Sequence, residues 1–168
     1  AAVAVVNAQL FAREQQRVNE LTALNQVAAT LSQSLDLDKM LEAALCDVLA
    51  VVRADAGGIA LVDAVNERLT LRTTLGLTGQ PALWPVVMAL GEGALGAVAS
   101  SGALMVIHDP ATHPLLDDAQ RQLLAQEGLR SVLILPIRSR GQVRGVLAVM
   151  VRRARRLSDE ETALLTSI

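Results

Sequence analysis

Two long apolar segments near the end of the chain limit most strongly what it can fold into. Residues 131–137 (SVLILPI) and 143–151 (VRGVLAVMV) flank a short polar stretch that contains Arg140-Gly141. Aliphatic and β-branched runs on either side of such a turn predict a β-hairpin. Both strands are apolar on both faces. We therefore expect a sheet that is covered on two sides, although its hairpins are antiparallel.

Further strands follow from the periodicity of the preceding sequence. Residues 59–63 and 68–75 predict a second hairpin, closed by the polar residues between them. Residues 86–90 and 103–108 predict two shorter strands. Helical segments lie before, between and after these strands, which indicates an α+β fold and not a wound parallel sheet.

Two helices with clear limits are predicted, and a third begins near the end. Residues 36–53 show helical spacing with Asp36 as the N-cap, and residues 116–127 form a second helix. Ser158 and Glu161 make a capping-box pattern for a last helix that the end of the sequence truncates.

The first 34 residues predict one long helix with an apolar stripe. No Gly or Pro occurs between residues 4 and 34, and apolar residues recur with heptad-like spacing. Glu14 and Arg17 interrupt the stripe, and Phe11 and Val18 beside them indicate a local phase shift. About 30 helical residues span about 45 Å, so we expect part of this helix to project and to pair with another helix. The residues expected to form the pairing surface are Leu10, Leu21, Leu24, Ala28 and Leu31.

Composition excludes several classes of function. A chain of 168 residues allows one domain with a sizeable core and one appended element. A net charge of −2 with one Trp, one Phe and no Tyr argues against nucleic-acid binding, and the basic cluster at residues 152–156 is interpreted as a solvated turn. No apolar run approaches the roughly 20 residues of a membrane span, so no membrane contact is expected. The single cysteine, Cys46, indicates a reducing, cytoplasmic setting.

The sequence GEGALG at residues 91–96 matches the dinucleotide fingerprint G-x-G-x-x-G and admits two interpretations. A dinucleotide site needs a βαβ unit, whereas the helix expected after Gly96 is barely two turns long. Asp117 and Asp118 lie at the distance of the ribose-binding acid, but they start a helix and do not end a strand. The other interpretation is a tight turn that brings a short helix onto the sheet, with the amides of residues 93–95 facing a cavity.

Taken in order, several segments resemble the GAF domain, a small-molecule-binding module of signalling proteins. The segments are residues 21–28 (LTALNQVA), 34–38 (SLDLD), 91–96 (GEGALG), 107–110 (IHDP), 129–137 (LRSVLILPI) and 145–149 (GVLAV). The resemblance implies a GAF/PAS-like antiparallel sheet of about six strands, with the N- and C-terminal helices on one face and a pocket of short helices and loops on the other. Residues 35–168 would be the GAF domain with a truncated closing helix. Residues 1–34 would be a connecting signalling helix whose start resembles the end of a preceding GAF domain, as in tandem sensors of histidine kinases.

The resemblance places a ligand pocket between the sheet and three segments, residues 76–90, 91–102 and 111–124. The candidate pocket residues are Trp84, Met88, Gly93, Ala94, Ala97, Asp109, His113 and Leu116. Asp117 and Asp118 are further polar candidates in this region. Taken by themselves, Asp109 is expected to cap the turn before Pro110 and His113 to be an ordinary solvated loop residue. Trp84 is either a lid over the pocket or a core residue.

Several subtypes of the family are excluded by what the chain lacks. The cyclic-nucleotide signature of the family includes Lys and Phe, but Lys39 and Phe11 lie outside the pocket region. Bilin attachment and methionine sulfoxide reduction need pocket or paired cysteines, and Cys46 lies on the opposite helical layer. No catalytic residue, metal or cofactor is predicted, because no nucleophile–base pair, metal-ligand cluster or facing carboxylates occur in the sequence. The ligand, if one binds, is an unidentified small molecule.

We therefore expect a regulatory sensor domain that controls an output domain. It would bind a small molecule, form a homodimer through its N- and C-terminal helices, or do both. Two alternatives remain at this level: a ligand-free structural dimerisation module, and an enzyme domain that holds a nucleotide at residues 91–96.

Overall fold

The computed structural model describes residues 1–78, 87–153, 158, 160 and 163. It divides into two units, Ala1–Lys39 and Met40–Ile168. Helix α1 (Ala2–Val51) makes up nearly all of the first unit and continues into the second. Among the described residues, none of the helices combines the length and the apolar character that a bilayer crossing requires.

Helix α1 does not end before Asp36, so the expected separate helix at residues 36–53 is wrong. The sequence between the two predicted helices contains no Gly or Pro. Each Asp in a helix interior costs at most about 0.7 kcal/mol relative to Ala. That cost is too small to break the hydrogen-bond ladder where residues on both sides favour a helix.

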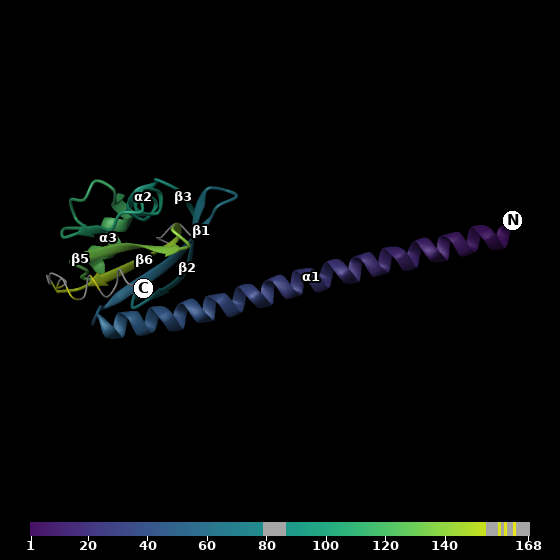
Figure 1. The fold of residues 1–168 in the computed structure, drawn as a ribbon, viewed down its shortest axis with the longest axis horizontal. Coiled ribbons are helices and arrows are strands. Elements are labelled where there is room, and N and C mark those ends of the chain that lie inside the picture. Colours follow the sequence, from purple (N-terminus) through teal and green to yellow (C-terminus); the bar gives the residue numbers. More distant parts are fainter. Residues whose placement is uncertain (79–86, 154–157, 159, 161–162, 164–168) are drawn as a thin grey trace. The chain divides into compact units, whose positions relative to one another are not determined.

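Six strands form one antiparallel sheet in the order β3-β2-β1-β6-β5-β4 (Figure 1). They are β1 (Ala56–Asp63), β2 (Arg68–Leu75), β3 (Val87–Ala89), β4 (Met105–Ile107), β5 (Ser131–Ser139) and β6 (Gln142–Val151). This confirms the predicted α+β fold with its six-stranded sheet. The β5–β6 hairpin closes at Arg140 (φ 52°) and Gly141 (φ 78°), the two left-handed residues of a type I′ turn.

Strand β1 begins three residues earlier than the sequence indicates. Residues 56–58 (AGG) lie outside the predicted strand, and Ala and Gly are depleted in strands. At Gly57 an added Cβ would lie 2.8 Å from the carbonyl oxygen of Ala148 and 2.9 Å from Cδ2 of Leu49. Glycine is therefore required at position 57, because β6 and helix α1 both approach it closely.

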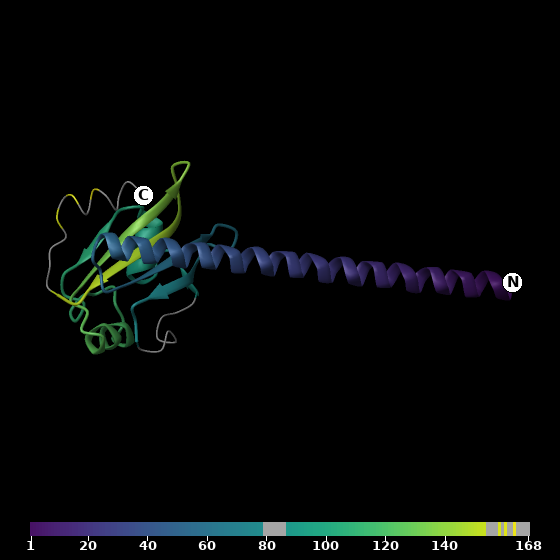
Figure 2. The ribbon, with the colours of Figure 1, turned by 90° about the horizontal axis from the view of Figure 1, so that it is seen from below.

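Alternate residues of the central strands face two separate apolar layers. In β5, Leu133 and Leu135 pack with the end of α1, whereas Val132 and Ile134 face the other side of the sheet. The first layer includes Leu45, Leu49 and Val52 of the α1 region, together with Ile59, Leu147 and Val149. The second layer includes residues of α2 (Gly93–Ser101) and α3 (Asp118–Gln126), namely Ala94, Leu95, Val98, Leu123 and Leu124. Figure 2 shows α1 crossing one face of the sheet, and the predicted two-sided burial is confirmed.

The N-terminal helix thus covers one face through its residues after Met40. The expected C-terminal helix, with Glu161 in its capping box, lies outside the described residues. Each fully buried leucine in these layers, such as Leu45 and Leu124, stabilises the fold by roughly 1.5–3 kcal/mol.

Candidate functional site

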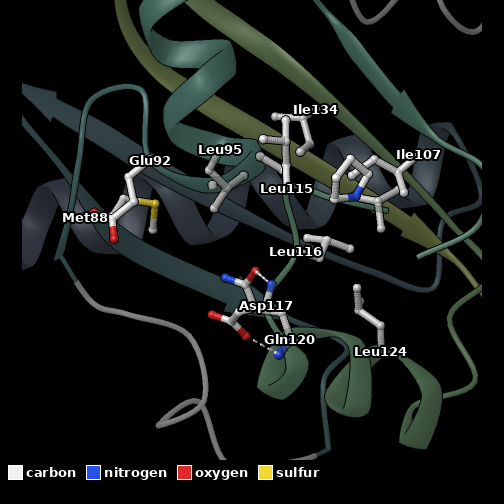
Figure 3. A pocket seen from close by; sticks show the side chains of 14 residues that line it. Met88, Glu92, Leu95, Ile107, Leu115, Leu116, Asp117, Gln120, Leu124 and Ile134 are labelled. Carbon is white, nitrogen blue, oxygen red and sulfur yellow. Dashed lines mark hydrogen bonds between the residues drawn. The ribbon is translucent and has the colours of Figure 1, made fainter. Parts of the chain in front are cut away.

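A pocket of about 310 Å³ lies between α2, α3 and the sheet (Figure 3). This volume is at the lower end of the range of about 300–1,000 Å³ typical of ligand sites. At roughly 30 Å³ per water molecule, it corresponds to about ten waters or a small organic molecule. The lining is Met88, Glu92, Gly93, Ala94, Leu95, Ile107, Pro114, Leu115, Leu116, Asp117, Gln120, Leu124, Val132 and Ile134.

The glycine-rich turn forms one wall of this pocket. Its glycines are required for two different reasons, the backbone conformation at two positions and the lack of space for a side chain at the third. Gly91 (φ 86°) and Gly93 (φ 62°) adopt the left-handed conformation that other residues rarely take. Gly96 has an ordinary φ, but an added Cβ would lie 2.7 Å from the carbonyl oxygen of Ala89. The amide of Gly91 donates to the carbonyl oxygen of Gly96 at 2.9 Å and closes the turn. The sequence GEGALG therefore brings the start of α2 against β3.

The fold excludes the interpretation of this turn as a dinucleotide-binding site. Helix α2 follows β3 and precedes β4, and these strands lie at opposite edges of an antiparallel sheet. The described residues thus contain no parallel βαβ unit around residues 91–96, and a dinucleotide fingerprint requires one. A short helix is confirmed as α2, but it begins at Gly93, inside the glycine-rich segment, and not after Gly96.

The polar residues of the pocket are held by local hydrogen bonds. Asp117 is the N-cap of α3: its Oδ1 accepts from the amide of Gln120 at 2.7 Å, and the Gln120 side chain accepts from the Asp117 amide at 3.2 Å. Figure 3 shows this reciprocal pair at the start of α3. Glu92 Oε2 accepts from the amide of Ala89 at 3.1 Å and makes no bond to the first turn of α2. The described lining therefore carries two carboxylates and one amide, and it contains no cationic side chain.

The structure brings together only some of the candidate pocket residues. Met88, Gly93, Ala94 and Leu116 line the pocket, as does Asp117. Trp84 lies outside the described residues, so its role as lid or core residue stays open.

Three other candidates are not among the described residues that line the pocket. Ala97 lies one turn further along α2. Asp109 caps its own turn, accepting from the amide of Ala111 and the hydroxyl of Thr112 at 3.1 Å each. The carbonyl oxygen of His113 accepts from Arg121 at 3.1 Å, which anchors the loop before α3.

The residues that form the floor of the pocket and part of its polar rim were not identified from the sequence. Ile107, Val132 and Ile134 form the floor from β4 and β5, and the period-two pattern of β5 marks the last two as facing the same side. Gln120 was detectable through the D-x-x-Q capping pattern that begins at Asp117. Nothing in the sequence pattern distinguishes Glu92 as a pocket residue.

A second polar cluster lies at the other end of α3. The Glu127 side chain is 5% exposed, and its Oε1 accepts from the amide and the hydroxyl of Thr78, both at 2.8 Å. Arg152 lies 3.4 Å from Glu127 Oε2 and also donates to the carbonyl oxygens of Glu127 (2.9 Å) and Gly76 (3.2 Å). The amide of Arg152 donates to Asp55 Oδ2 at 2.7 Å. Arg152 and Arg153 are exposed and follow β6 directly, as the interpretation of the basic cluster as a solvated turn predicts, but Arg152 also makes these specific contacts. Residues 154–156 of the cluster lie outside the described residues.

An antiparallel six-stranded sheet with a helix on one face and a pocket under two short helices on the other is the architecture of a sensor-type α+β module. The family model of the GAF domain matches residues 36–168, so the chain belongs to the GAF domain family. GAF domains are signalling and sensor modules, generally regulatory and not catalytic.

Solved structures share this fold. The chain is similar to the GAF domains of the phosphoenolpyruvate-protein phosphotransferases of Coxiella burnetii (24% identity, TM-score 0.66, 78% of this chain and 76% of that chain) and Acinetobacter (23%, 0.63, 78% and 75%). It is also similar to a GAF domain/HD domain protein of Geobacter sulfurreducens (23%, 0.65, 82% and 89%). At these identities the similarity concerns the fold. No curated protein matches the chain.

Proposed function

We propose that this GAF domain is a regulatory sensor that binds a small, largely apolar molecule, neutral or positively charged, in the pocket between α2, α3 and the sheet. The observation that carries the proposal is the composition of the lining. Its floor is made of buried apolar side chains such as Leu95 and Ile134, and its charged groups are the carboxylates of Glu92 and Asp117. An apolar floor favours transfer of apolar surface out of water by about 25 cal/mol per Å².

The two carboxylates set the expected charge of the ligand. A unit charge about 5 Å from one carboxylate interacts with it by roughly 1–3 kcal/mol at effective dielectric constants between 80 and 20. Both Glu92 and Asp117 are exposed, so the lower value applies to each. The negative charge of the two carboxylates disfavours anionic ligands and favours cationic ones. The amides in the first turn of α2 supply donors for a neutral polar group.

Three probes of similar size and different charge test the proposal: benzylamine, toluene and benzoate. We expect benzylamine and toluene to shift the NMR methyl signals of Met88, Leu95 and Ile134 at millimolar concentration, and benzoate to shift them least. Ala94→Leu fills the pocket and should abolish these shifts. Ala97→Leu, the matched change outside the lining, should leave them intact. If no probe shifts these signals, or if Ala94→Leu does not reduce the shifts, the binding proposal is wrong.

A conservative variant separates the charge of Asp117 from its structural role as the N-cap of α3. Asp117→Asn keeps an N-cap residue of similar preference for α3 but removes one carboxylate. Benzylamine should then bind several-fold more weakly, whereas the affinity for toluene should not change. Equal losses for both probes would show that Asp117 acts only on the shape of the pocket.

We also propose that the domain pairs with a second copy through α1. This is supported by large apolar side chains on α1 that are more than half exposed, among them Leu10 (54%), Leu21 (61%), Leu24 (65%) and Leu31 (59%). Ala28 belongs to the same stripe. An exposed apolar stripe of this length normally meets a partner. Paired helices would transmit the state of the pocket to an output domain such as a histidine kinase. The single cysteine, Cys46, supports a reducing, cytoplasmic setting.

Sedimentation equilibrium tests the pairing. The wild-type chain should be a dimer at micromolar concentration, and Leu24→Asp should shift it toward monomer. Gln26→Asp places the same charge on the opposite side of the helix and should leave the dimer intact. A wild-type monomer at all concentrations, or equal effects of the two variants, would overturn this part of the proposal. In that outcome the ligand-binding proposal is unaffected.

A further inference from the structure

We propose that Glu14 and Arg17 make the α1 seam selective for a second copy of this chain. This inference rests on the proposed pairing through α1 and adds what determines the choice of partner. The seam is defined here as the helix face that carries Leu10, Glu14, Arg17, Leu21 and Leu24. Residues separated by three, four and seven positions share one face of a helix. Leu10, Glu14 and Arg17 also line one hollow on the surface of α1.

The two charged residues occupy seam positions between apolar ones. The spacing of four, three and four residues from Leu10 to Glu14, Arg17 and Leu21 continues the alternation that places Leu24 and Leu31 on the same face. Phe11 and Val18, 70% and 55% exposed, lie one position beyond Leu10 and Arg17. They widen the apolar surface at this level, so a partner helix that covers the leucines also covers both charges.

Neither charge is paired within the described part of the chain. The residues next to them in sequence, by contrast, form hydrogen bonds along the helix: Gln15 donates to Asn19 at 3.4 Å, and Gln16 donates to Glu20 at 3.2 Å. Glu14 and Arg17 are three residues apart, yet they form no ion pair with each other or with another described residue. Burying an unpaired charge is strongly unfavourable, whereas a facing opposite charge offsets much of the loss of water.

A second copy of this chain that runs antiparallel supplies the opposite charges at the required level. In an antiparallel pair centred between these residues, Glu14 of one helix lies directly opposite Arg17 of the other. In a parallel in-register pair, Glu14 would face Glu14 and Arg17 would face Arg17, so the charges favour the antiparallel arrangement. A helix with apolar residues or a single sign of charge at these positions would leave at least one charge uncompensated. Polar residues within an otherwise apolar seam are an established way to specify register and partner.

Two charge-reversal variants of the full chain test the selectivity of the antiparallel pair. Glu14→Arg gives a seam with only positive charges, and Arg17→Glu gives one with only negative charges. Each variant alone should dimerise at least about tenfold more weakly than the wild type. An equimolar mixture should form heterodimers with an affinity near that of the wild-type homodimer. The double variant Glu14→Arg/Arg17→Glu should recover homodimers.

Matched controls carry added charge on the solvated side. Gln15→Arg and Asn19→Glu introduce the same signs of charge outside the seam and should leave the dissociation constant within about twofold of the wild type. Circular dichroism checks that every variant keeps its helix content, and sedimentation equilibrium gives the dissociation constants. If the wild type dimerises and both single seam variants dimerise equally tightly, the selectivity is wrong and the pairing stands. If the wild type and the mixture are both monomeric, the pairing itself is overturned, and the selectivity with it.

Discussion

Replacing Glu127 by alanine should destabilise the folded domain by about 2–3 kcal/mol. The carboxylate is 5% exposed and accepts two hydrogen bonds of 2.8 Å from Thr78, besides its contact with Arg152 at 3.4 Å. Hydrogen bonds to a charged group contribute roughly 1.5–3 kcal/mol each, and breaking a fully buried ion pair costs roughly 3–5 kcal/mol. The Arg152 side chain is 41% exposed and Thr78 is exposed, so water replaces part of what is lost. This places the expected value below the range for a fully buried pair.

The variant Glu127→Gln separates the contribution of the Thr78 hydrogen bonds from that of the Arg152 contact. Glu127→Gln keeps one oxygen to accept from Thr78. Its NH2 group takes the place of Oε2, so the variant loses both the charge and the acceptor opposite Arg152 and should cost about 1 kcal/mol. As a control, Asp118→Asn removes a carboxylate that is 99% exposed and lies 3.0 Å from Arg121. That change should cost less than about 0.5 kcal/mol because the pair is solvated.

Urea unfolding at pH 7, followed by far-ultraviolet circular dichroism, gives the three free energies of unfolding. A loss of 2–3 kcal/mol corresponds to a fall of about 10 °C in Tm for a domain of this size. The reasoning is refuted if Glu127→Ala loses less than about 1 kcal/mol, or if it loses no more than Glu127→Gln. Either result would mean that Thr78 and Arg152 are as well satisfied by water as by Glu127.

Three smaller predictions concern single positions. Gly96→Ala should cost about 1–3 kcal/mol in urea unfolding, because its Cβ would lie 2.7 Å from the carbonyl oxygen of Ala89; an unchanged stability would show that the turn relaxes freely. The side chain of Asn66 donates to Asp63 at 2.6 Å and, with the neighbouring backbone amides, lowers the pKa of that carboxyl. The hydrogen-bonding stabilisation is therefore present above the ordinary Asp pKa and is lost as pH falls through the lowered folded-state pKa. Asn66→Ala should raise the pKa of Asp63 in an NMR titration, and an unchanged pKa would assign the shift to the backbone amides. Arg140→Asn should raise Tm by a few degrees, because Asn adopts the left-handed conformation (φ 52°) more readily than Arg; a lower Tm would show that the Arg140 side chain itself stabilises the hairpin.

Continuous apolar runs predicted β5 and β6 well, because strands that face both layers carry apolar residues at almost every position. The sequence pattern failed at residues 56–58, which belong to β1, and at Asp36, which lies inside α1. At Gly57 the low strand preference yields to close contacts with β6 and α1, which are distant in sequence. At Asp36 a local cost of at most about 0.7 kcal/mol yields to the helix-forming residues on both sides.

The place of the candidate pocket follows from the family resemblance, whereas its chemistry does not. Of the residues that the resemblance offered, Gly93, Ala94 and Leu116 line the pocket of the structure. Whether Asp109 and His113 also line it depends on where their loop packs, and loop packing leaves no periodic signal. Their hydrogen bonds show that they organise the loop itself. The carboxylate of Glu92 joins the rim because of the glycine turn, and only the three-dimensional structure displays that position.

The cluster around Arg152 has a consequence for where the polypeptide enters and leaves the sheet. The amide of Asp55 donates to the carbonyl oxygen of Met150 at 3.0 Å, and the amide of Arg152 donates to the carboxylate of Asp55 at 2.7 Å. The polypeptide therefore enters the sheet and leaves it at a single corner. The segment before β1 and the segment after β6 are thus linked directly by hydrogen bonds, and the rest of the sheet does not separate them.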